Sequence, residues 1–178
     1  MVIACKKEDP SPETFDHVIP TINDFDRAGV NELKLPGQAY IYFSKLIFIN
    51  FQTDFWFFDS TTNHFSPKAD FPGKDRISLQ LVPFNQSIYG GLSKVQTNPR
   101  LDDWFIYDTL GNHWTVKLSC PFPIPNAMEG NKSGSGKILF SCPYAINGSS
   151  LCPVEYDVTN NSWSRNTKNC DSLAISCF

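Results

Sequence analysis

The side chains that could do chemistry are few and lie far apart in the sequence. The histidines are His17, His64 and His113. A histidine can act as a general acid or base or bind a metal ion, but His64 and His113 stand at the same place in two related segments, which indicates a role in turns. Catalysis by a serine–histidine–aspartate set or by paired carboxylates would need residues that converge on one site. No such set is visible, so we predict no catalytic residue, no cofactor and no enzyme activity.

The remaining charged candidates are Asp75, Arg76, Arg100 and Asp102, which we interpret as solvated or structural residues of loops. The sequence holds 15 lysines and arginines against 18 acidic residues, so it offers no basic face for a nucleic acid. It contains no Cys-x-x-Cys pair and no cluster of histidine and cysteine, so we expect no zinc site. No apolar run approaches the length of a transmembrane helix.

The first cysteine lies in a segment that resembles the processing site of a bacterial lipoprotein. Residues 2–5 read Val-Ile-Ala-Cys, a small-residue cleavage site after which the cysteine carries lipid. Only Met1 precedes it, so the apolar signal would have to begin upstream of this start. The acidic, proline-rich residues that follow are typical of a tether. We therefore expect lipid on Cys5, with an unmodified cysteine near the terminus as the alternative.

The other cysteines are candidates for disulfides in an oxidising compartment. Cys142 and Cys152 fall on strands predicted to be hairpin neighbours, which makes this pair a plausible disulfide. Cys170 with Cys177 or Cys120 offers further pairs. Spacing alone does not decide the connectivity.

One seven-residue turn occurs three times and organises the chain. Its aspartates, its asparagines and its closing aromatics are each spaced by 49 residues and again by 49. A repeat near 50 residues predicts a propeller or a solenoid. Aspartate can accept backbone amides two residues on, and asparagine tolerates the left-handed conformation that closes a hairpin. We assign these structural turn roles to Asp59, Asn63, Asp108, Asn112, Asp157 and Asn161.

Aromatic and β-branched runs predict strands around each turn. Four strands in about 50 residues match one propeller blade, whereas the stretch 129–136, rich in glycine and serine, is predicted to be a loop. Residues 30–35 are expected to form either the innermost strand of the first blade or a lead-in. The predicted strands are 39–43, 45–51 and 54–58, then 77–82, 86–91, 103–107 and 114–118, then 137–142, 151–156 and 162–165. The predicted core includes Trp56, Phe58, Phe65, Ile106, Trp114, Tyr156 and Trp163.

With these features the chain resembles kelch-repeat β-propeller proteins of the secreted or lipid-anchored kind in Gram-negative bacteria. The matching features are the three turns with their aromatics, the double glycine Gly90-Gly91 and the segment 68–73. The double glycine occurs once, and its expected counterparts are Asn50-Phe51 and Ser141-Cys142. The resemblance covers about residues 37–178. In such relatives the loop before Arg76 faces the central channel, which makes Arg76 the charged candidate most open to a binding role.

The resemblance implies an all-β kelch-type propeller, with about three blades of four antiparallel strands in an incomplete or open ring. We expect residues 1–36 to be a tether and lead-in and 37–178 to hold the blades. The blades would cover about 37–70, 71–120 and 121–169, and residues 170–178 would begin a further one.

The function that follows is a non-catalytic binding or interaction module for a protein or glycan ligand. It would act at the bacterial outer membrane or in the periplasm, held to the membrane only through lipid on Cys5, or else be secreted. One alternative is a propeller enzyme of the galactose-oxidase-like or sialic-acid-epimerase-like type, although no copper-ligand spacing of tyrosines and histidine is visible. Another is an intracellular kelch adaptor, although 36 leading residues could not hold a recruiting domain.

Overall fold

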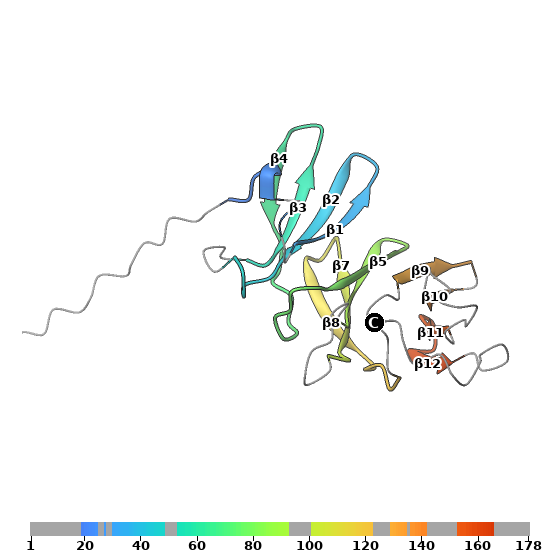
Figure 1. Cartoon of the computed structure of the whole chain (residues 1–178). Coiled ribbons are helices and arrows are strands. Elements are labelled where there is room, and N and C mark those ends of the chain that lie inside the picture. The colour runs from blue at the N-terminus through green and yellow to red at the C-terminus, as the bar shows by residue number, and fades with distance from the viewer. Residues whose placement is uncertain are drawn as a thin grey trace, which may run out of the picture.

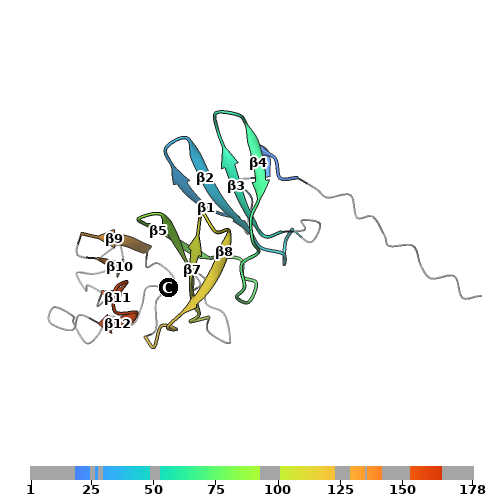
Figure 2. The same ribbon diagram turned by 180° about the vertical axis from the view of Figure 1, so that it is seen from behind.

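The computed structural model describes residues 19–24, 27, 30–48, 53–92, 101–122, 129–134, 136–141 and 153–165. These residues form three four-stranded antiparallel sheets and a 3-10 helix, Ile22–Asp24, with no α-helix among them. In each sheet the strands lie in sequence order, and the sheets stand beside one another as successive blades (Figure 1). Figure 2 shows the same order from behind.

The first sheet contains β1 (Val30–Leu35), β2 (Gln38–Phe43), β3 (Phe55–Asp59) and β4 (His64–Pro67). The second contains β5 (Gln80–Phe84), β6 (Ser87–Gly91), β7 (Trp104–Asp108) and β8 (His113–Lys117). The third contains β9 (Glu129–Ser133), β10 (Lys137–Ser141), β11 (Val154–Asp157) and β12 (Ser162–Arg165).

The three sheets share one register. The first residue of the second strand pairs with the turn aspartate in each: Gln38 with Asp59, Ser87 with Asp108, and Lys137 with Asp157. The repeated turn therefore closes the outer hairpin of every blade.

Aromatic side chains fill the spaces between neighbouring blades. Between the first and second blades, the ring of Phe55 lies 5.0 Å from that of Tyr107 and 5.1 Å from that of Trp114. Between the second and third, the ring of Trp104 lies 5.6 Å from that of Phe140. Of the predicted core, Trp56, Phe58, Phe65 and Tyr156 are buried, and Ile106, Trp114 and Trp163 are partly buried against the core clusters.

Two predicted elements differ in the structure. Residues 45–47 form a turn instead of the start of a strand, because the Ser44 carbonyl accepts the amides of Ile47 and Phe48 at 3.0 and 2.9 Å. Residues 49–52 lie outside the described part. The predicted loop 129–136 contains the strand β9, which pairs with β10. Gly130 suits this strand because a Cβ there would meet Phe140 and Val82 at 2.6 Å, so close packing outweighs the low strand propensity of glycine.

The strand register also decides the role of residues 30–35 and the counterparts of the double glycine. Residues 30–35 pair with β2 along their whole length, so of the two expected roles they have that of a strand in the first blade. Gly90 and Gly91 correspond in register to Ile41 and Tyr42 in the first blade, not to Asn50-Phe51. In the third blade they correspond to Phe140 and Ser141.

Candidate functional site

The three turn aspartates bind the backbone of their own turns. The Oδ1 atoms of Asp59, Asp108 and Asp157 accept the amides of Thr61, Leu110 and Asn160 at 2.8, 3.0 and 2.9 Å. Hydrogen bonds within the turns lower the pKa of all three carboxyls, above all from the Thr61 hydroxyl at Asp59 and from the Gly111 and Asn160 amides at Asp108 and Asp157. These carboxylates therefore stabilise hairpins.

The turn asparagines take the conformation that the pattern predicts. Asn63, Asn112 and Asn161 have φ angles of 52, 50 and 48°, the left-handed region that asparagine tolerates better than most residues. Together, these aspartates and asparagines give each of the three turns its local hydrogen bonds and its closing conformation.

In the second and third blades, residues of the same turn also form hydrogen bonds with the backbone of the preceding blade. Asn112 Oδ1 accepts the amide of Ala69, and Trp114 Nε1 donates to the Ala69 carbonyl, each at 2.9 Å. One repeat later, Asn161 Oδ1 accepts the Leu118 amide at 3.2 Å and Trp163 Nε1 donates to its carbonyl at 2.7 Å. We call each such pair of hydrogen bonds an inter-blade contact.

A tyrosine orients each of these asparagines. The hydroxyls of Tyr107 and Tyr156 donate to Asn112 and Asn161, both at 2.7 Å. The first blade has Phe58 and Phe65 at the tyrosine and tryptophan positions, so it has neither the hydroxyl nor the indole N–H. Sequence reasoning treated the three aromatics as equal core residues, although the 49-residue alignment already contained this difference.

Arg76 is not a loop charge that faces solvent. It is 1% exposed, and its Nη1 and Nη2 donate to the two carboxylate oxygens of Asp103 at 2.8 and 2.6 Å. Its Nη1 also donates to the Leu92 carbonyl at 2.6 Å, and its Nε donates to that of Lys74 at 2.9 Å. The two-pronged geometry of a guanidinium matches a carboxylate, so the pair joins the loop before β5 to the start of β7.

The other charged candidates do not gather around one point. Asp75 accepts the Tyr42 hydroxyl and, at 2.6 Å, the Leu46 amide. The backbone carbonyl of Asp102 accepts the Cys120 amide at 2.8 Å. His64 and His113 are exposed at the starts of β4 and β8, and Arg100 lies outside the described residues.

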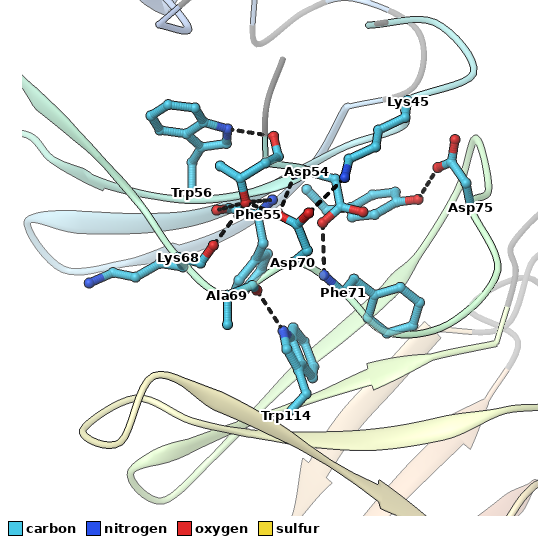
Figure 3. A network of polar contacts seen from close by, with 12 residues as sticks. Lys45, Asp54, Phe55, Trp56, Lys68, Ala69, Asp70, Phe71, Asp75 and Trp114 are labelled. Carbon is cyan, nitrogen blue, oxygen red and sulfur yellow. Dashed lines mark hydrogen bonds and ion pairs between the residues drawn. The ribbon is translucent and has the colours of Figure 1, made fainter. Parts of the chain in front are cut away.

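A polar network lies where the first blade meets the loop after β4 (Figure 3). Its most buried carboxylate is Asp54, which is 4% exposed and whose Oδ1 accepts the Phe71 amide at 2.8 Å. Asp70 bridges to Lys45 Nζ at 2.7 Å and also accepts the Thr53 hydroxyl. Burial raises the pKa of Asp54 to about 6, with the Phe71 amide and Lys45 opposing the shift.

A carboxyl with a pKa near neutrality is typical of sites that exchange protons. Asp54, however, is almost fully buried and its carboxylate accepts the Phe71 amide. Within the described ranges, no three histidine, cysteine or acidic side chains gather as metal ligands would. The network is therefore better suited to fixing the loop after β4 than to handling a substrate.

A cleft of about 400 Å³ lies between the first and second blades. The β1–β2 hairpin forms one wall, and the hairpin turns of the second blade form the other. All of its lining residues are uncharged. Its size falls in the range of small-molecule sites, which makes it the candidate ligand site of the described chain. The cleft could not be predicted from the sequence, because its lining residues, such as glutamine, serine and proline, belong to no motif.

Two sequence-predicted sites, a lipid site and a disulfide, lie outside the described residues. Cys5, Cys142 and Cys152 fall outside the described residues, so the lipid site and the disulfide stay predictions. None of the described segments forms a helix long and apolar enough to cross a membrane.

The repeated sheets and their inter-blade packing define a β-propeller type of protein. Among solved structures, the fold is similar to that of YjhT, a kelch-repeat propeller protein, with a TM-score of 0.59 and 12% sequence identity. The match covers 82% of this chain and 52% of that one, so the chain spans about half the length of its structural relative. No family model and no curated protein sequence matches the chain.

Proposed function

We propose that the chain is a non-catalytic binding module built on a propeller scaffold, and that its ligand is a glycan or a protein. The observation that carries this is how the charged groups are used: Arg76 is buried against Asp103, and Asp54 is buried against the Phe71 amide. The turn aspartates are likewise engaged with their own backbone. The cleft between the first and second blades is lined by uncharged, hydrogen-bonding and apolar residues, which suits recognition better than acid–base chemistry.

The place of action we propose is the bacterial cell envelope, with lipid on Cys5 as the anchor. Support for this comes from the sequence Val-Ile-Ala-Cys and the tether-like residues after it. Expression behind a lipoprotein signal in a bacterium, followed by mass spectrometry of the N-terminal peptide, tests it. A diacylglyceryl mass on Cys5, absent from Cys5→Ser, is the expected result, and an unmodified cysteine in the wild type contradicts the anchor.

The competing proposal is a propeller enzyme, since kelch-type folds also carry catalysis. To separate the two, the 178-residue chain is assayed for binding to a glycan array and for galactose oxidation with copper and sialic acid epimerisation. Binding without turnover is expected. Turnover that chelation abolishes, or steady epimerisation of N-acetylneuraminate, would replace the binding module with an enzyme.

A further inference from the structure

The positions that line the cleft between the first and second blades have equivalents at the junction of the second and third blades, and different residues occupy them. At the second junction, Lys132 lies with its ammonium 5.1 Å from the ring centre of Phe84 and 3.4 Å from Asn85 Oδ1. In sheet register, Lys132 corresponds to Pro83 and Phe84 to Leu35. At the first junction, Pro83 thus stands in place of the lysine and Leu35 in place of the phenylalanine. Both side chains are shorter and apolar, and both line the cleft.

The polar side chains of this cleft are available to a ligand. Gln38, Tyr40, Gln86 and Ser87 line it, and no hydrogen bond within the described part of the chain uses their side-chain polar groups. Tyr40 is 7% exposed, yet its hydroxyl has no partner there, unlike the hydroxyls of Tyr107 and Tyr156. The buried polar side-chain atoms without a partner in the described residues are Ser44 Oγ and Trp104 Nε1, so the Tyr40 hydroxyl is reached by solvent, and a ligand in the cleft would replace water as its hydrogen-bond partner.

The chemistry of the lining limits the ligand. A charged ligand would leave water for a cleft whose lining carries no opposite charge, which is unfavourable. Amide and hydroxyl groups together offer both donors and acceptors, while Leu35, Pro83 and Ile88 offer apolar surface. A sugar ring combines hydroxyls around its rim with apolar C–H faces. A cleft of about 400 Å³ is wide enough for one or two such rings.

We infer that the cleft between the first and second blades binds an uncharged saccharide, with Tyr40 and Gln38 among its hydrogen-bonding groups. The inference rests on the proposed binding function and makes it specific, since it excludes acidic sugars from this site.

Two variants test the site, and each has a matched control. Pro83→Lys installs the lysine of the next blade and is expected to abolish binding by filling the cleft. Tyr40→Phe removes only the hydroxyl and is expected to weaken binding by about 2- to 10-fold, the effect of one hydrogen bond, without loss of thermal stability. The controls are Lys132→Ala and Tyr89→Phe, which alter the corresponding positions at the second junction and should leave binding at the first junction unchanged.

Binding of lactose, maltose and chitobiose to the 178-residue chain is measured by saturation-transfer NMR and calorimetry, with N-acetylneuraminate as the charged comparison. The expected result is a neutral saccharide bound in a Tyr40- and Pro83-dependent manner, with N-acetylneuraminate unbound at this site. If none of the three neutral sugars binds, the inference is wrong. If a sugar binds but neither variant weakens it, the binding function stands and the cleft assignment fails. Tyr40-dependent binding of a glutamine- and serine-rich peptide would overturn the ligand class.

Discussion

The first and second blades carry an aspartate at the same position, Asp54 and Asp103, 49 residues apart just before the third strand of each sheet. Their backbones do the same work. The carbonyls of Asp54 and Asp103 accept the amides of Phe43 and Leu92, at 2.7 and 3.0 Å, where the second strand ends. The two side chains, however, are held in opposite ways.

Asp103 is paired with the buried Arg76, whereas Asp54 has the Phe71 amide and the more distant Lys45. The residue 49 positions before Arg76 is Arg27, which pairs instead with Asp24 at 2.8 Å and keeps 56% of its side chain exposed. The second blade thus pairs Asp103 with a permanently charged arginine. In the first blade, the charge of Asp54 depends on pH. A repeated backbone contact does not require a repeated electrostatic partner.

The largest effect in this comparison is expected from Arg76→Ala. Removing the guanidinium leaves the Asp103 carboxylate without its cation and the Leu92 carbonyl without the hydrogen bond that Arg76 donates. Breaking a buried ion pair from one side costs about 3–5 kcal/mol, and urea unfolding followed by tryptophan fluorescence measures the loss. The matched control is Arg27→Ala, an exposed pair expected to cost about 0–1 kcal/mol. Equal losses would show that the two arginines are equivalent after all.

The next effect is the pH dependence that Asp54 gives the first blade. Its pKa is about 6 in the folded protein against 3.8 for the ordinary group, so the folded state binds the proton more tightly. Stability should therefore increase as pH falls from 7 toward 4, by up to about 3 kcal/mol for two units of pKa. Lys45, Asp70 and Asp75 face the same network and also set the size of the shift.

Asp54→Asn tests this origin, because it keeps a carbonyl oxygen for the Phe71 amide but has no proton to bind. Urea midpoints at pH 7, 6, 5 and 4 should rise toward low pH in the wild type and stay nearly flat in the variant. A wild type that becomes less stable between pH 7 and 5 would refute the raised pKa of Asp54.

The inter-blade contact should give a smaller effect, and one that depends on the blade. Trp114→Phe leaves the Ala69 carbonyl without its indole donor, which we expect to cost about 1 kcal/mol. It also makes the second blade resemble the first, where Phe65 stands at this position. Thermal unfolding compares it with Phe65→Leu, which removes aromatic packing only. If Trp114→Phe is as stable as the wild type, the contact contributes packing and not hydrogen bonding.

The repeat could be predicted from the sequence because its turn depends on local chemistry. Asp59 and Asn63 act on their own backbone, so spacing alone identifies them. The strand β9 and the turn after β2 could not be predicted, since Gly130 sits in a strand only because Phe140 and Val82 approach it, and Leu46 turns toward an aspartate far along the chain. For Arg76 the sequence left open a solvated or a structural role, because its partner Asp103 lies 27 residues away.

The smallest expected effect concerns the turn aspartates, and it has the opposite sign to that of Asp54. Hydrogen bonds from the turn lower the pKa of Asp108 below 3.8 in the folded state, so its contribution to stability is present above that pH and lost as pH falls further. Asp108→Asn keeps an oxygen that can accept the Leu110 amide and should change the urea midpoint little at pH 7.

Asp108→Ala removes this acceptor and should lower the midpoint slightly at pH 7, with the difference from wild type shrinking below pH 4 as the wild-type carboxyl gains its proton. Titration of the Asp108 carboxyl by NMR gives the pKa directly. The hairpin carboxylate of Asp108 is expected to have a lowered pKa and the buried carboxylate of Asp54 a raised one. A measured pKa of Asp108 above that of Asp54 would contradict this difference.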